Sequence, residues 1–202
     1  MPKIKSQRLP LVWDSQTSRY RDQQGRFVAR TTITEARNRI VNDTQQKLRA
    51  ISQQFLDGKI SLAEWQTSFK DIIKAAHTLV AGIAMGGKAN MTAADWGRVG
   101  QLLRAQYEAL NRFALQIEAG KKLSLGRVDH YAASIRSTFL NAERLRQPQF
   151  AVARWVRTKR ESCEDCREQE RRGVQLLSTF PRIGTLRCRH RCGCYLDLKL
   201  KR

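Results

Sequence analysis

Four stretches of the chain repeat apolar residues every three or four positions, the spacing of one buried helix face. They cover about residues 33–57, 62–85, 93–119 and 125–146. The connections between them are short, and short connections favour antiparallel neighbours. The pattern therefore predicts a mainly α fold, with an antiparallel helical bundle over residues 31–148.

Polar residues stand where the expected helices begin. Thr32 with Glu35, and Ser61 with Glu64, have the spacing of a capping box, which satisfies backbone N–H groups of the first turn. Thr92 is the expected N-cap of the third helix, where an acidic residue follows in the first turn. Residues that end helices follow each stretch: Gly58, Gly86, Gly87, Gly120 and Pro148.

The two ends of the chain lack this helical periodicity. Residues 1–30 are polar and basic with scattered aromatic residues, and a turn is expected at Gly25. We expect an extended basic arm that becomes ordered against a partner. Residues 149–162 form a basic linker, and residues 163–202 have a turn-rich, β-type composition that ends in a short alternating strand at 195–200.

Charge adds a second constraint. The 202 residues include 38 Lys and Arg against 18 Asp and Glu, a net charge of +20 and a pI near 10.6. Such self-repulsion is tolerated most simply when the partner is a polyanion, with nucleic acid favoured over an anionic membrane surface. No apolar stretch is long enough to span a bilayer and no signal-peptide core is present, so we expect no membrane partner and a cytoplasmic site of synthesis.

The cysteines form a pattern typical of a local site. All five lie in the last 40 residues: Cys163, Cys166, Cys188, Cys192 and Cys194. Two clusters of thiolates, with a first pair two residues apart, suit a tetrahedral ion. We expect a structural zinc ion bound by the first four cysteines, with Cys194 as the main substitute for Cys192.

Other interpretations of these cysteines stay open. His190, between two arginines, is either a fourth ligand or a surface residue. Disulfides and unpaired thiols are the alternatives to metal. A catalytic zinc is disfavoured because catalytic sites keep an open position, and the chain has no nucleophile triad or phosphate loop. We therefore expect no enzymatic activity.

The excess of basic residues indicates where a polyanion could bind. The last 52 residues hold 14 basic and 6 acidic residues, and the remaining net charge of +12 is spread over the first 150. This distribution favours broad contact over a groove-reading helix. Aromatic residues among the basic ones, Trp13, Tyr20, Phe27 and Trp155, could stack on bases. The expected nucleic-acid-binding residues are Arg154, Arg157, Lys159, Arg160, Arg187, Arg189 and Arg191.

The C-terminal segment resembles a known family. The Cys-x2-Cys pair, then Phe180–Cys188, then Cys192-Gly193-Cys194-Tyr195-Leu196, is similar to the C-terminal motif of minor head proteins of tailed bacteriophages, the head-morphogenesis family. The segments 19–22 and 25–28 are similar to short segments of phage structural proteins. The chain is shorter than is usual in the family, and it has three residues between Cys188 and Cys192 where a histidine and a two-residue gap are common.

The resemblance implies a structural protein in several copies in the phage head. Its partners would be the portal protein, the major capsid protein or both, and packaged double-stranded DNA, with assembly in the host cytoplasm. A capsid-lining or connector protein is a neighbouring role. From another class, a sequence-tolerant or regulatory nucleic-acid-binding protein with a zinc module is the alternative, and a zinc-dependent nuclease is a third.

Overall fold

The structure is a computed structural model of the chain, and it describes residues 11–17, 19–147, 150–158, 162–188 and 192–199. The described residues are mainly helical, with small β-sheets. The chain divides into two units, Met1–Phe139 and Leu140–Arg202, and each is described by itself below. The division falls inside a helix, about nine residues before the boundary at 148 that the sequence predicts.

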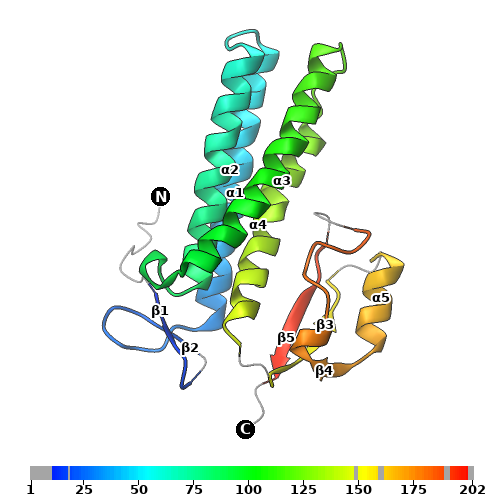
Figure 1. Ribbon diagram of the computed structural model, residues 1–202. Coiled ribbons are helices and arrows are strands. Elements are labelled where there is room, and N and C mark those ends of the chain that lie inside the picture. Colours follow the sequence, from blue (N-terminus) through cyan, green and yellow to red (C-terminus); the bar gives the residue numbers. More distant parts are fainter. Residues whose placement is uncertain (1–10, 18, 148–149, 159–161, 189–191, 200–202) are drawn as a thin grey trace. The chain divides into compact units, whose positions relative to one another are not determined.

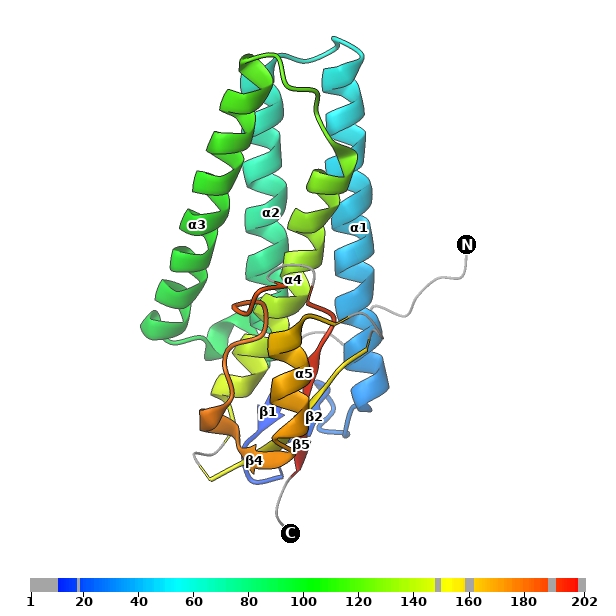
Figure 2. The same cartoon turned by 90° about the vertical axis from the view of Figure 1, so that its right-hand side faces the viewer.

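Long helices make up most of the first unit. They are α1 (Arg30–Leu56), α2 (Leu62–Ala84), α3 (Ala93–Glu118) and α4 (Leu125–Leu145), and the 3-10 helix η2 (Lys88–Asn90) precedes α3 (Figures 1 and 2). Their predicted apolar faces meet in one core, to which all four long helices contribute. At its centre Trp65 is fully buried and donates to Ser52 Oγ at 3.0 Å.

Two of the three expected helix starts are confirmed. Ser61 with Glu64, and Thr92 with Asp95, form complete capping boxes at α2 and α3. The predicted N-cap at Thr32 is wrong, because the N-cap of α1 is Ala29, three residues earlier, and it makes no side-chain hydrogen bond. Thr32 and Glu35 have the spacing of a capping box, but both residues lie inside the helix.

Residues 12–17 and 19–28 form a folded hairpin where the sequence predicts an extended arm, whereas residues 1–10 of the expected arm lie outside the described residues. Strands β1 (Val12–Asp14) and β2 (Arg19–Arg21) pair antiparallel, with Trp13 opposite Tyr20. Tyr20 is buried, and its hydroxyl donates to the carbonyl oxygen of Ala84 at the end of α2, at 2.7 Å. The prediction missed this anchor because a strand of three residues has too short an alternation to read from sequence.

The second unit combines the last turns of α4 with a three-stranded sheet. The sheet order is β4-β3-β5, formed by β3 (Val152–Val156), β4 (Val174–Leu176) and β5 (Tyr195–Lys199), and both pairings are antiparallel. Helix α5 (Glu164–Arg171) and the 3-10 helix η3 (Leu177–Thr179) lie between strands in sequence (Figure 1).

This sheet corrects one expectation and confirms another. The predicted basic linker at 149–162 contains β3, the central strand, in which Ala153 and Trp155 are fully buried. The short strand has one basic residue, Arg154, and is followed by Arg157, Lys159 and Arg160, so the basic composition of the segment hides a strand whose other face is part of a core. The expected strand near 195–200 is confirmed as β5.

Candidate metal centre

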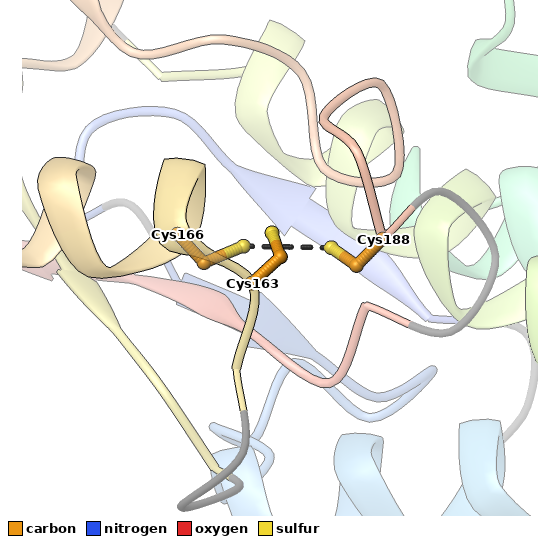
Figure 3. Close-up of side chains that lie close together, drawn as sticks. All are labelled: Cys163, Cys166 and Cys188. Atoms are coloured by element: carbon orange, nitrogen blue, oxygen red, sulfur yellow. Dashed lines mark hydrogen bonds between the residues drawn. The ribbon is translucent and has the colours of Figure 1, made fainter.

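The five cysteines come from three local elements of the second unit. Cys163 is the N-cap of α5, and Cys166 lies in the first turn of that helix. Cys188 belongs to the loop after η3, and Cys192 and Cys194 lead into β5. Figure 3 shows that the sulfur atoms of Cys163, Cys166 and Cys188 point toward one another. A helix start and two loops therefore converge on one point.

The distances between sulfur atoms fit a bound metal ion. The Sγ of Cys166 is 3.5 Å from that of Cys188 and 3.9 Å from that of Cys192. Four thiolates at the usual zinc–sulfur distance in a tetrahedron lie about 3.8 Å apart. A disulfide bond needs about 2.0 Å, and none of the five cysteines, all of them described, is joined in one.

The thiols form two overlapping groups that share Cys166. One contains Cys163, Cys166 and Cys188, and the other contains Cys166, Cys192 and Cys194; within each group the sulfur atoms lie within 4.8 Å of one another. The predicted cysteines are thus close enough to bind a metal ion. The shared position of Cys166, which is fully buried, makes it the centre of the cluster.

The electrostatics of the cluster differ from one thiol to the next. A hydrogen bond from the Cys194 thiol lowers the pKa of Cys192 to about 5 and raises the pKa of Cys194 itself. Burial raises the pKa of Cys166 to about 12 and raises that of Cys188 as well. Burial also opposes ionisation of Cys163, but hydrogen bonds from Cys166 outweigh it and lower its pKa. Without a cation, the cluster thus disfavours several thiolates at once, and a cation bound there would supply the missing compensation.

Hydrogen bonds hold the loops that carry these cysteines. The carboxylate of Asp165 accepts from the backbone N–H of Arg187 at 3.0 Å, which fixes the loop next to Cys188. The Thr158 hydroxyl donates to the carbonyl oxygen of Gly193 at 2.8 Å, which fixes the loop between the last two cysteines. The thiols therefore converge within a supported loop structure.

Two residues at the end of α4 also hold the segment that leads to Cys188, and sequence reasoning missed both. Asn141 makes two hydrogen bonds of 3.0 Å with the backbone of Ile183. The Arg144 guanidinium donates to carbonyl oxygens of the segment 177–181, at 2.7 to 2.9 Å for the three closest. Burial lowers the pKa of Arg144. Sequence carries no signal for these contacts, since the partners are backbone atoms.

The described arginines among the predicted nucleic-acid-binding residues are paired with carboxylates. Arg154 faces Asp197 at 3.6 Å, Arg187 faces Asp165 at 3.4 Å, and Arg157 bonds Glu170. Their charge is therefore partly neutralised within the unit. The other predicted residues lie outside the described part of the chain: Lys159, Arg160, Arg189 and Arg191, and with them His190.

This arrangement suits a structural ion. Four thiolates around a tetrahedral ion leave no position for a reacting water, whereas a catalytic site needs one.

No family model, curated protein or solved structure matches the chain. None of the helices in the described ranges is both long and apolar enough to cross a membrane.

Proposed function

We propose that the cluster holds one zinc ion through Cys163, Cys166, Cys188 and Cys192, and that the ion is structural. The supporting observations are the group of Cys163, Cys166 and Cys188, and the distance of 3.9 Å that joins Cys192 of the second group to the buried Cys166. An all-thiolate tetrahedral set is characteristic of structural zinc. Cys194 then acts as a neighbour that donates a hydrogen bond to Cys192.

We propose further that the chain is a structural minor head protein of a tailed phage. The observation that carries this proposal is that the cysteines of the phage-like C-terminal segment converge on one site instead of scattering over the surface. In this role the C-terminal unit with the cysteine cluster is a rigid part of the protein, and the protein acts in assembly of the capsid and portal. The net charge of +20 supports contact with packaged DNA.

The helices of the first unit would supply the protein contacts, as an antiparallel bundle. Short connections between successive helices support this arrangement. So do side-chain contacts between helices: Arg49 of α1 pairs with Asp129 of α4, and Gln66 of α2 donates to Asn111 of α3 at 2.6 Å. A rigid bundle offers long surfaces to a portal or capsid protein.

A regulatory zinc finger is the alternative from another class. Such a finger would read base edges with guanidinium groups, yet Arg154, Arg157 and Arg187 all face carboxylates. The two roles differ in specificity. A regulator prefers one duplex sequence by about 10³ or more, whereas a virion protein binds all duplexes alike with a steep salt dependence.

The zinc proposal is tested by metal analysis of protein purified without chelator or reductant. We expect about one zinc per chain, lost in Cys163→Ser and Cys166→Ser. Cys194→Ser is the matched control, because it removes a thiol of the same cluster and should keep the metal. Metal-free protein with four of its five cysteines in disulfides, or zinc retained in Cys166→Ser, would overturn the assignment.

The phage-head proposal is tested on purified particles. Particles induced from the strain that carries this sequence are purified on a density gradient and analysed by mass spectrometry. We expect peptides of this chain at a constant ratio to the major capsid protein, and at a few copies per portal. Absence of the chain from particles that contain packaged DNA would refute the proposal.

A further inference from the structure

The outer face of the N-terminal hairpin carries an unusual group of side chains. Strand alternation puts Trp13 and the buried Tyr20 on the inner face. Arg19 and Arg21 therefore share the outer face, where an isolated bridge pairs Arg21 with Phe27. We call these three outer residues, Arg19, Arg21 and Phe27, the arginine face.

One aromatic ring organises both guanidinium groups. The Arg19 guanidinium carbon lies 4.1 Å from the centre of the Phe27 ring, and that of Arg21 lies 4.0 Å from it. The ring is 43% exposed although it is large and apolar. A guanidinium that stacks on a ring still directs its N–H edge outward, where it can donate to an anion. Arg21 already donates through Nε to Asp14 at 2.8 Å and through Nη1 to the Gly25 carbonyl oxygen at 2.7 Å, so Arg19 is the main anion donor of the pair.

The carboxylates near this face lie beneath the cations. Asp14 pairs with Arg21 at 2.8 Å, and their side chains are 17% and 34% exposed. Asp22 pairs with Arg26 at 2.8 Å, and the Asp22 side chain is 4% exposed whereas that of Arg26 is 67% exposed. An approaching anion therefore meets guanidinium groups first, and the carboxylates serve to orient them.

The hairpin is also held rigid. The Asp22 carboxylate accepts hydrogen bonds from the backbone N–H groups of Gln24 and Arg26, which fixes the turn. The Tyr20 hydroxyl is bound to the α2 carbonyl of Ala84, and the N–H of Val28 donates to the Tyr20 carbonyl at 2.8 Å. Preorganised arginines lose less conformational entropy on binding than mobile ones.

We propose that the arginine face binds the phosphate backbone of duplex DNA without reading its sequence. The inference rests on the DNA contact in the proposed function and gives that contact a location. Planar guanidinium groups match phosphate oxygens in pairs. Phe27 is engaged by two cations, so it positions them and does not serve as a platform for stacked bases. The described part of the hairpin consists of strands and turns and offers no α-helix to enter the major groove, so we expect its arginines to contact phosphates and binding to be insensitive to sequence.

The test measures binding of the full-length protein to a short duplex of mixed sequence over a series of salt concentrations. Arg19→Gln removes one cation from the face. Arg104→Gln is the matched control, since it removes one exposed cation from α3 of the same unit. A plot of log affinity against log salt has a negative slope, and we expect Arg19→Gln to make this slope less steep by about 0.9. This change weakens binding about eightfold near 0.1 M salt. We expect Arg104→Gln to leave the slope unchanged.

A second variant separates the ring from the charges. Phe27→Leu keeps both arginines, so we expect weaker binding with an unchanged salt slope, and thermal unfolding checks that the hairpin is intact. Equal effects of Arg19→Gln and Arg104→Gln would overturn the arginine face and leave the proposed function standing. Wild-type protein that fails to bind duplex DNA, but binds anionic vesicles or an acidic protein, would overturn both the face and the DNA contact.

Discussion

A histidine in the core of the first unit makes the stability of the protein sensitive to acid. His77 of α2 is fully buried, and its Nδ1 lies 2.7 Å from the hydroxyl of Thr138 on α4. Ser134 lies 3.4 Å from Nε2. Burial lowers the pKa of His77 to about 4. The folded protein therefore keeps this ring neutral, with hydroxyl groups on both sides.

We expect the free energy of unfolding to fall as the pH drops from about 6.5 to about 4. In that window the unfolded chain takes up a proton on His77 that the folded chain refuses, so acid favours unfolding. A shift of this size amounts to about 3 kcal/mol over the whole window. Urea unfolding at several pH values measures it.

The variant His77→Gln isolates this contribution, because it cannot titrate. We expect its stability to vary less with pH between 6.5 and 4 than that of the wild type. The pKa of Asp14 is lowered to about 2, mainly by its hydrogen bond to Arg21, so its contribution is lost only below this window. Identical pH profiles for the two proteins would show that folding does not change the pKa of His77, and would contradict the prediction.

Helix starts show how far local sequence reaches at the scale of one element. Ser61 and Thr92 are N-caps, as their spacing to an acidic residue predicts. Thr32 has the same spacing, but the helix runs through it from Arg30. The capping rule states what a helix start requires, whereas the position of the start also depends on packing of the preceding turn, which tertiary contacts decide.

This contrast gives a prediction with its own control. Ser61→Ala removes the acceptor for the Glu64 backbone N–H, so we expect a loss of about 1 kcal/mol in the free energy of unfolding. Thr32→Ala, at the false cap, should be neutral or slightly stabilising, because alanine favours a helix interior. Thermal and urea unfolding measure both. Equal losses would mean that Thr32 caps α1 after all.

The second unit shows where element prediction fails. The segment 149–162 predicts a linker because basic residues dominate its composition, although β3 lies within it and Trp155 of β3 is fully buried. Helix α5 has eight residues and one buried side chain, Cys166, and its segment predicts turn-rich chain instead of a helix. A single buried position gives no periodicity, so a helix this short is defined by its partners.

The end of α4 offers a second prediction at this scale. Asn141→Ala removes both hydrogen bonds to the backbone of Ile183. The partly buried N–H and C=O groups of Ile183 then lose these partners. We expect a loss of about 1–3 kcal/mol, confined to the second unit. Hydrogen exchange followed by mass spectrometry locates it. Asn111→Ala, which removes an exposed contact with Gln66, should change exchange little; a uniform loss over both units would contradict the prediction.

At the scale of the whole molecule, the candidate site was more predictable than the fold around it. Cysteine spacing alone picked out the cluster, because ligands for one ion must come from tight turns a few residues apart. The state of the arginines was not predictable. Arg154 pairs with Asp197, 43 positions away in the chain, and only the register of β3 with β5 brings them together. The net charge therefore predicts the class of partner but does not predict which surface of the protein binds it.

The metal and the two units together give the last prediction. The second unit is small, and much of its structure converges on the thiols, so its folding should depend on the ion. The first unit has its own core from four helices and no cysteine. A chelator should therefore abolish exchange protection in β3, α5 and β5 while α1, α2 and α3 stay protected. Cys163→Ser should reproduce that pattern without chelator. Loss of protection in α1 and α2 as well would mean that the two units fold as one, and unchanged protection everywhere would mean that the thiols hold their loops without a metal.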